Sequence, residues 1–176
     1  MLLLSLTATQ LATLLVTACG SSPSHGRPYA LPDPCSVVQA GDAEYVLGQA
    51  GKEARLPHTI TTPTGIHVAG CGWVSSTGSS SVNVDVWGPP DASDFYAASL
   101  RVGRQSEAQF THTTVIPGAT KAFVRYAAVV FGYGSLVVSI FVTSYRGIDF
   151  RNEAAVALAP FAIRNLRALG PASRGG

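Results

Sequence analysis

Cysteines and histidines are the residues whose chemistry would say most about this sequence. The cysteines are Cys19, Cys35 and Cys71. The histidines are His25, His58, His67 and His112. Neither Cys35 nor Cys71 has a cysteine or histidine neighbour at metal-ligand spacing, no H-E-x-x-H motif occurs, and no serine lies in G-x-S-x-G. We therefore expect no metal, no cofactor and no enzyme activity, with a site formed in space by His58, His67 and His112 as the alternative.

Asp85 and Trp87 are the two residues that could contact a ligand. Residues 82–87 alternate valines with polar residues and Trp87, a pattern typical of a half-buried strand. Trp87 would lie on the face opposite the valines, where it either contacts a ligand or is covered by a helix, and we favour the helix. Asp85 shares that face, where a solvated carboxylate is the simpler interpretation. Two further acids, Asp91 and Asp94, fit a helix start, whose dipole favours negative charge.

Residues 1–18 have the character of a secretory signal peptide. Leu2–Ala18 is almost wholly apolar or small, too short for the roughly 20 residues that span a bilayer but normal for a signal. The segment ends in Val16-Thr17-Ala18-Cys19, which resembles the lipobox of bacterial lipoproteins. We expect cleavage before Cys19 and lipidation of its thiol, which would hold the chain on the extracytoplasmic face of the cell membrane. An ordinary cleaved signal and a short uncleaved anchor are the alternatives.

The composition of the chain fits one small extracytoplasmic domain. About 158 residues remain after the signal peptide, a normal domain size. Charged residues make up 12% of the sequence and hydrophobic residues 47%, which predicts a globular core rather than a disordered segment. The net charge of +2 and the scattered basic residues give no stripe that would bind nucleic acid. Ten arginines against two lysines suggest a GC-rich genome, such as that of an actinobacterium.

Cys35 and Cys71 are the two cysteines that remain if Cys19 carries lipid. An even remainder in an exported chain indicates one disulfide. Closing a loop of about 36 residues would stabilise the fold by roughly 3–4 kcal/mol in the chain-entropy model. Two free thiols are the alternative, and they are uncommon outside the cytoplasm. Trp73 would point to the same side of a strand as Cys71, which predicts an indole packed on the disulfide.

Cap and breaker residues predict three helices. Asp33 as N-cap and Gly48 as C-terminal stop predict a first helix, with Val37, Ala40, Ala43 and Leu47 on one face. A second helix would run from Asp91 to about Arg104, with Phe95, Ala98 and Val102 inward. A third would be capped by Asp149 and end near Leu169, with its first turns kinked or separated by Pro160. Its expected apolar stripe is Val156, Ala159, Ile163, Leu166 and Leu169.

Alternating or β-branched runs predict the strands. We expect strands at Ile66–Ser75 and over residues 82–87, with a short one at Thr59–Thr62. Residues 121–131 and 135–143 are rich in Val, Ile, Phe and Tyr, which predicts two further strands. The stretch Ala127–Val142 is apolar enough to suggest a membrane span, but its two glycines and its β-branched residues favour a buried antiparallel hairpin. The fold class is therefore α+β, a mostly antiparallel sheet of about five or six strands packed with three helices.

The expected domain organisation follows the composition along the chain. Residues 1–18 are the signal peptide, and residues 19–32 hold the lipidated cysteine and a Ser- and Pro-containing tether. Residues 33–170 form one globular domain, and residues 171–176 are a loose tail.

Several short motifs of the mature chain occur in a recognisable order. They are Asp33-Pro34-Cys35, Val46-Leu47-Gly48, Cys71-Gly72-Trp73, Ile116-Pro117-Gly118-Ala119 and Lys121-Ala122-Phe123. This set resembles a family of actinobacterial secreted lipoproteins of unknown function, whose members start with a DPC motif and carry a later C-x-W. The resemblance covers residues 33–169 and departs at Ala119-Thr120, where the family usually has Gly-Asp.

The resemblance has consequences for the fold and the site. It implies a disulfide between Cys35 and Cys71. It also implies a fold similar to other mycobacterial envelope lipoproteins, with an antiparallel sheet covered by helices in a PsbP-like arrangement. The family offers no established catalytic residues, and fold analogy does not give function.

Two hypotheses of different classes fit the sequence. The first is a module that binds an apolar or amphipathic envelope molecule, such as a lipid or glycolipid, in a cleft between sheet and helix. It predicts a cleft, and a solid core would count against it. The second is a structural or interaction protein that contacts another envelope protein through an exposed apolar patch. A lipid-tethered hydrolase is a third reading, which the missing catalytic constellation disfavours.

Overall fold

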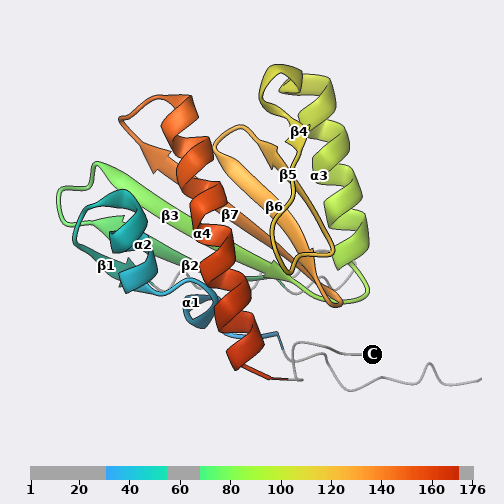
Figure 1. The fold of residues 1–176 in the computed structure, drawn as a ribbon, viewed down its shortest axis with the longest axis horizontal. Coiled ribbons are helices and arrows are strands. Elements are labelled where there is room, and N and C mark those ends of the chain that lie inside the picture. Colours follow the sequence, from blue (N-terminus) through green and yellow to red (C-terminus); the bar gives the residue numbers. More distant parts are fainter. Residues whose placement is uncertain (1–30, 55–67, 171–176) are drawn as a thin grey trace, which may run out of the picture.

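Seven strands form one antiparallel sheet in the computed structural model, which describes residues 31–54 and 68–170 (Figure 1). The strands are β1 (Gly51–Ala54), β2 (Val68–Ser75), β3 (Ser80–Trp87), β4 (His112–Thr113), β5 (Lys121–Arg125), β6 (Ala128–Tyr133) and β7 (Leu136–Ser144). Their order across the sheet is β1-β2-β3-β7-β6-β5-β4. The predicted α+β class is confirmed, with seven strands in place of the expected five or six.

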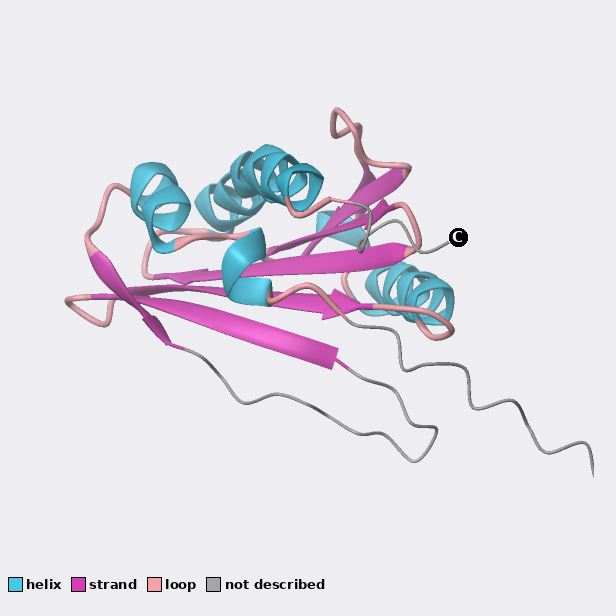
Figure 2. Ribbon diagram, turned by 90° about the horizontal axis from the view of Figure 1, so that it is seen from below, coloured by secondary structure: helices cyan, strands magenta, loops and turns pink. Residues whose placement is uncertain are grey.

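Helices cover both faces of the sheet. They are α1 (Pro34–Val37), α2 (Ala40–Leu47), α3 (Ala92–Ser106), the short 3-10 helix η1 (Ala108–Phe110) and α4 (Ile148–Ala168). Figure 2 shows α2 and α4 on one side of the sheet and α3 on the other. Side chains alternate between the two faces along each strand, so the strands contribute to one hydrophobic core on each face of the sheet. Val84 faces α4 and α1, whereas Val130 and Val137 face α3.

The predicted first helix is two helices. Its ends are confirmed, because the Asp33 carboxylate accepts a hydrogen bond from the Cys35 N–H (3.1 Å) and Gly48 adopts a left-handed conformation (φ 66°). The single continuous helix is wrong, since Val38 is extended and Gln39 starts α2. Gln39 and Asp42 form a reciprocal capping box at this second start.

Helix α3 starts after Asp91 as expected but buries a different face. Its buried residues are Ala92, Tyr96, Ser99 and Gly103. Of the expected inward residues, Phe95 is half-buried and does pack against the sheet-side cluster, whereas Ala98 is only half-buried and Val102 is 44% exposed. Tyr96 takes the central place because its ring packs edge-on against Phe123 of β5, with 5.0 Å between ring centroids.

Helix α4 is one unbroken helix. The expected separation of its first turns at Pro160 is wrong, and Pro160 lies on the exposed side. Gly147, not Asp149, is its N-cap, and Asp149 falls in the first turn. The residues buried against the sheet are Ala154, Ala155, Leu158, Ala159, Ala162, Ile163, Asn165 and Leu166. Two members of the expected stripe lie outside this set, since Val156 is half-buried and Leu169 is 44% exposed.

The predicted hairpin of residues 121–143 is a meander of three strands. The expected strand 121–131 divides at Tyr126 and Ala127, and Ala127 has a positive φ of 56°. Tertiary hydrogen bonds hold this turn, because the Ala127 N–H donates to Asn152 Oδ1 (2.8 Å) and the Ala127 carbonyl accepts from Val142 (2.8 Å). The apolar stretch that could have suggested a membrane span forms β6 and β7 in the core. No described helix is long and apolar enough to cross a membrane.

Two strands of the sheet were not predicted. Edge strand β1 pairs with β2 in a segment that was expected to hold turns. Edge strand β4 pairs with β5 over His112 and Thr113, in a polar segment without a predicted element. The expected strand at Thr59–Thr62, and the first two residues of Ile66–Ser75, lie outside the described residues.

Candidate functional site

A disulfide ties the start of the domain to the sheet. Cys35 of α1 and Cys71 of β2 are bonded, with an S–S distance of 2.11 Å and a Cα–Cα distance of 5.2 Å. Both residues are buried. The predicted disulfide is therefore present, and it fixes the four-residue helix α1 against β2.

Trp73 lies beside this disulfide on the inner face of β2. Its side chain is 4% exposed, and with Cys71 and Val38 it lines a cavity of only about 10 Å³. A Cβ atom at Gly51 of β1 would overlap the Trp73 indole, so the glycine allows the ring to lie against the neighbouring strand. The space around Trp73 thus has room for about one water and for no larger ligand.

Glu53 lies beside the disulfide. Its carboxylate and the sulfurs of Cys35 and Cys71 lie within 4.8 Å of one another, the one such grouping of possible metal ligands among the described residues. Zinc and similar metals bind cysteine as the thiolate. Because these two sulfurs are joined, the oxidised protein offers the carboxylate alone, which makes a poor metal site.

Two larger depressions are open to solvent. One, of about 410 Å³, lies beside α1 and is lined by Asp33, Cys35, Ser36, Gln39, Ala40, Gly41 and Glu53. The other, of about 380 Å³, is lined by His112, Thr114, Val124, Asp149, Asn152, Glu153 and Val156. The depression beside α1 is lined mostly by polar groups, and the depression beside His112 is lined by polar and apolar groups in similar amounts. Neither depression encloses the apolar surface that would hold a lipid chain.

His112 is the one histidine that lies among the described residues. His112 is exposed on β4 and faces the depression that Asp149 and Glu153 also line. His25, His58 and His67 lie outside the described residues, as does Cys19. His112 and these two acids do not form a tight group of metal ligands.

Trp87 and Asp85 lie on the α3 face of β3. The Trp87 ring stacks on Phe95 of α3, with 3.8 Å between centroids and 12° between planes. A helix therefore covers Trp87, which is the arrangement favoured from the sequence. Asp85 is half-buried between Gly70 of β2 and Ser139 of β7. The two residues share a face as predicted, and the stacking against Phe95 occupies one side of the indole.

Tyr96 is a buried phenol on this face whose pKa departs from its ordinary value. Burial raises the pKa of the Tyr96 hydroxyl from its ordinary value of 10.0, and the positive charge of Arg104 opposes the shift. The Lys121 ammonium also lies over the Tyr96 ring, 4.1 Å from its centroid. A phenol that keeps its proton is suited to packing, not to general-base chemistry at neutral pH.

A polar cluster joins α2 to α4 on the other face. The Asp42 carboxylate accepts hydrogen bonds from the Asn165 amide (2.9 Å) and the Arg164 guanidinium (2.8 Å). The Asn165 amide also donates to the Val37 carbonyl (3.1 Å). Asp42 and Asn165 are buried, so this cluster fixes α1 and α2 on the last third of α4.

Aromatic and arginine side chains gather where β7 meets α4. Tyr145 is 77% exposed, and the Arg146 guanidinium lies 3.5 Å from the centroid of the Phe150 ring. The neighbouring turn adds a second group, in which the Phe110 and Tyr126 rings are 5.5 Å apart and Arg151 lies 5.6 Å from Tyr126. We call these six residues the far-end patch. Sequence reasoning missed them, although Tyr145-Arg146 directly after a strand was the available signal.

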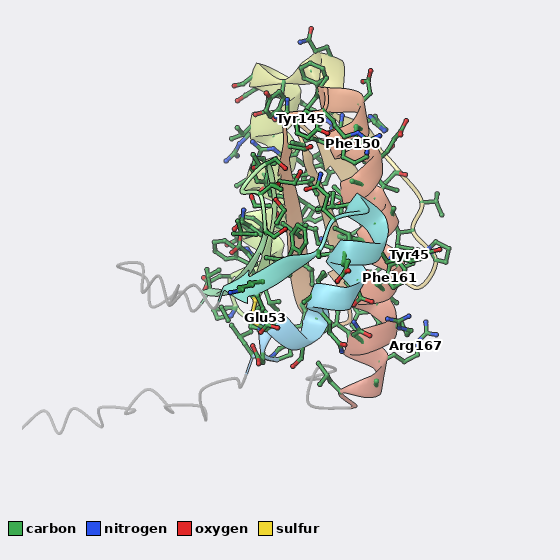
Figure 3. All side chains as sticks on the ribbon, turned by 90° about the vertical axis from the view of Figure 1, so that its left-hand side faces the viewer. Tyr45, Glu53, Tyr145, Phe150, Phe161 and Arg167 are labelled. Atoms are coloured by element: carbon green, nitrogen blue, oxygen red, sulfur yellow. A yellow bond between two sulfur atoms is a disulfide. The ribbon has the colours of Figure 1, made fainter. Side chains whose placement is uncertain are left out.

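The far-end patch lies at the opposite end of the molecule from α1. Phe150 lies in the first turn of α4, and Asn165 near the other end of this helix contacts α1. The 21 residues of α4 make the helix about 30 Å long. Figure 3 shows Tyr145 and Phe150 at one end of the molecule and Arg167 at the other, with Tyr45 and Phe161 between them.

Tyr45 and Phe161 form a smaller group on the side of the molecule. Their rings meet edge to face at 5.7 Å, and the Arg164 guanidinium lies 4.9 Å from the Phe161 centroid. Tyr45 is 79% exposed, about as much as Tyr145. Arg164 is already paired with Asp42 and so has less freedom to bind a partner.

Comparison with protein-family models, with curated proteins and with solved structures finds no match for this chain. The functional reading therefore rests on the residues and geometry described above.

Proposed function

We propose that this chain is a secreted lipoprotein, lipidated on Cys19 and held on the extracytoplasmic face of the cell membrane, whose domain binds another protein of the cell envelope. The lipobox-like end of the apolar segment supports the anchor, and the resemblance to DPC-motif lipoproteins supports the same class. The observed Cys35–Cys71 bond agrees with what that resemblance implies. The proposal includes no catalytic step.

The filled core is the observation that favours protein contact over ligand transport. Among the described residues, the cavity beside Trp73 holds about 10 Å³ and the two larger depressions are open. A carrier for a lipid or glycolipid needs an apolar pocket of about 300 Å³ or more that buries most of the ligand. These three pockets, which the described residues line, offer open surfaces and no enclosed apolar space of that size.

The far-end patch supplies the residue types that carry binding energy in protein interfaces. Tyrosine and arginine are enriched among interface hot spots, because each combines a large contact area with hydrogen-bonding groups. Arg146 is stacked on Phe150, which leaves the edges of its guanidinium able to bind a carboxylate. The Arg151 Nε–H is buried and has no acceptor among the described residues. The partner surface expected here combines apolar side chains with carboxylates.

Site-specific crosslinking tests this proposal. A photoreactive phenylalanine analogue placed at Tyr145 in the full chain, expressed in its own cell envelope, should give a discrete adduct with one protein. Tyr45 is the matched control, because it is a tyrosine of nearly equal exposure on another surface. Arg146→Ala should weaken the adduct from Tyr145 without changing the thermal stability. Equal adducts from both positions, or none from Tyr145, would refute the far-end patch as the contact surface.

Native mass spectrometry distinguishes the two functional classes. The chain purified from the envelope without denaturation should have the mass of the lipidated protein, two hydrogens short for the disulfide. An additional mass that is released on unfolding would instead favour the ligand-binding module, and it would identify the ligand class directly.

A further inference from the structure

Three structural segments meet at the end of the molecule where α1 begins. The Asn165 amide joins α4 to the Val37 carbonyl of α1. The loop between β4 and β5 lies beside the last turns of α4, since a Cβ at Gly118 would come within 3.0 Å of Ile163 and of Arg167. Gly118 has a φ of +90°, a conformation that glycine adopts without strain. The loop can therefore lie directly on the helix.

This end exposes apolar side chains that the fold holds in place. Val115 is 91% exposed, whereas the next residue, Ile116, is 4% exposed in the main core. The Ala119 N–H donates to the Ile116 carbonyl (3.0 Å), which closes the turn. Val115 is thus fixed outward by a buried neighbour, and Leu169 at the end of α4 is 44% exposed.

A positive charge accompanies these apolar residues. Arg167 is exposed in the last turn of α4 and is in none of the ion pairs between described residues. Arg164 lies one turn earlier, with its side chain 60% exposed and one contact to Asp42. We call Val115, Pro117, Arg167 and Leu169 the near-end patch. Apolar side chains next to arginine are the combination that binds the interface of a bilayer with anionic lipids.

The length of chain before the domain limits how far this end can be from a membrane. The roughly twelve residues from Cys19 to Leu31 span at most about 40 Å when fully extended. Leu31 packs against the core near α1, so the chain enters the domain at the near end. The near-end patch therefore lies at the end of the domain where the chain from Cys19 enters, within reach of the bilayer that holds the anchor.

We propose that the near-end patch binds the surface of an anionic bilayer, as a second membrane contact beside the lipid on Cys19. This inference rests on the proposed function for its anchor, but the contact itself needs only the surface. The contact would also orient the domain, with the far-end patch about 30 Å away along α4 and directed out from the membrane.

Vesicle flotation of a chain without lipid tests the contact separately from the anchor. The mature chain with Cys19→Ser should float with vesicles of equal parts phosphatidylcholine and phosphatidylglycerol, and much less with phosphatidylcholine alone. Arg167→Gln should lower the partition coefficient about five-fold, the expected effect of one cation near an anionic surface. Val115→Asp should lower it at least as much, because it removes an apolar contact and adds a negative charge.

Matched controls lie on α3, on the other face of the sheet. Val102→Asp and Arg101→Gln alter an exposed valine and an exposed arginine there, and both should leave flotation unchanged. All four altered side chains are exposed, so thermal unfolding should stay close to that of the parent. Equal flotation of the near-end and α3 variants, or no flotation of the parent, would overturn the proposal.

Other outcomes separate this inference from the proposed function. If Arg167→Gln floats normally but loses the crosslink that a photoreactive residue at Val115 forms with a protein, that surface contacts a protein and the membrane proposal fails. Lipidation is measured independently, as the mass of the N-terminal fragment from the envelope. If the Cys19→Ser chain floats and the native N-terminal fragment carries no lipid, the membrane contact stands and the anchor is rejected.

Discussion

Asp42 gives the most direct test of how α1 and α2 are held on α4. Asp42→Ala removes three accepted hydrogen bonds at once, from the Gln39 N–H (3.1 Å), the Asn165 amide (2.9 Å) and the Arg164 guanidinium (2.8 Å). The residue is 7% exposed, so water cannot readily replace these partners.

The three contacts of Asp42 contribute unequally. Loss of the bond to the helix start costs about 1 kcal/mol, and a buried amide donor left without its acceptor costs about 1–3 kcal/mol. The Arg164 side chain is 60% exposed, so its ion pair adds at most about 1 kcal/mol after solvent screening. The expected loss of unfolding free energy is about 3 kcal/mol.

Urea unfolding at neutral pH measures this loss. Glu44→Ala is the control, because it removes an exposed acid from the same helix and should change stability by less than about 0.5 kcal/mol. In a double-mutant cycle, Asp42→Ala and Asn165→Ala should be coupled by about 1 kcal/mol or more. Equal stabilities for Asp42→Ala and Glu44→Ala would refute the role assigned to this cluster.

Two further predictions concern the α3 face and the β5–β6 turn. Burial raises the pKa of Tyr96 in the folded state, so its contribution to stability is complete below the unfolded value near 10.0 and is lost as pH rises through the folded value. Unfolding free energy should therefore fall more steeply above pH 10.0 in the parent than in Tyr96→Phe, and parallel curves would contradict the shift. Asn152→Ala leaves the Ala127 N–H without its acceptor and should cost about 1–3 kcal/mol in urea unfolding. Asn152→Asp retains an oxygen acceptor and should lose less, and an equal loss in both variants would argue against the hydrogen bond.

Local signals in the sequence located many boundaries and the disulfide. The Asp33 cap and the Gly48 stop are side-chain and backbone effects that act within a few residues. The alternation of residues 82–87 put the valines on one face, because strand side chains point in opposite directions in turn. The pairing of Cys35 with Cys71 followed from counting the cysteines left after Cys19.

Tertiary contacts decided the features that sequence reasoning missed. The capping box of Gln39 and Asp42 is a weak local signal for the break at Val38, and tertiary contacts reinforce it, since α1 is bonded to β2 while α2 is fixed on α4 through Asp42. The turn at Ala127 has no glycine or asparagine, and distant groups on Asn152 and Val142 hold its positive φ.

The candidate surfaces depended on the tertiary structure even more. Phe110 and Tyr126 lie in separate segments, and their contact follows from the pairing of β4 with β5 and of β5 with β6. The sequence by itself determined a disulfide-bonded α+β chain, because apolar pattern and cysteine number are properties of the chain alone. Whether the core is filled, and which side chains remain outside it, was decided only by packing, because burial depends on partners that are distant in sequence.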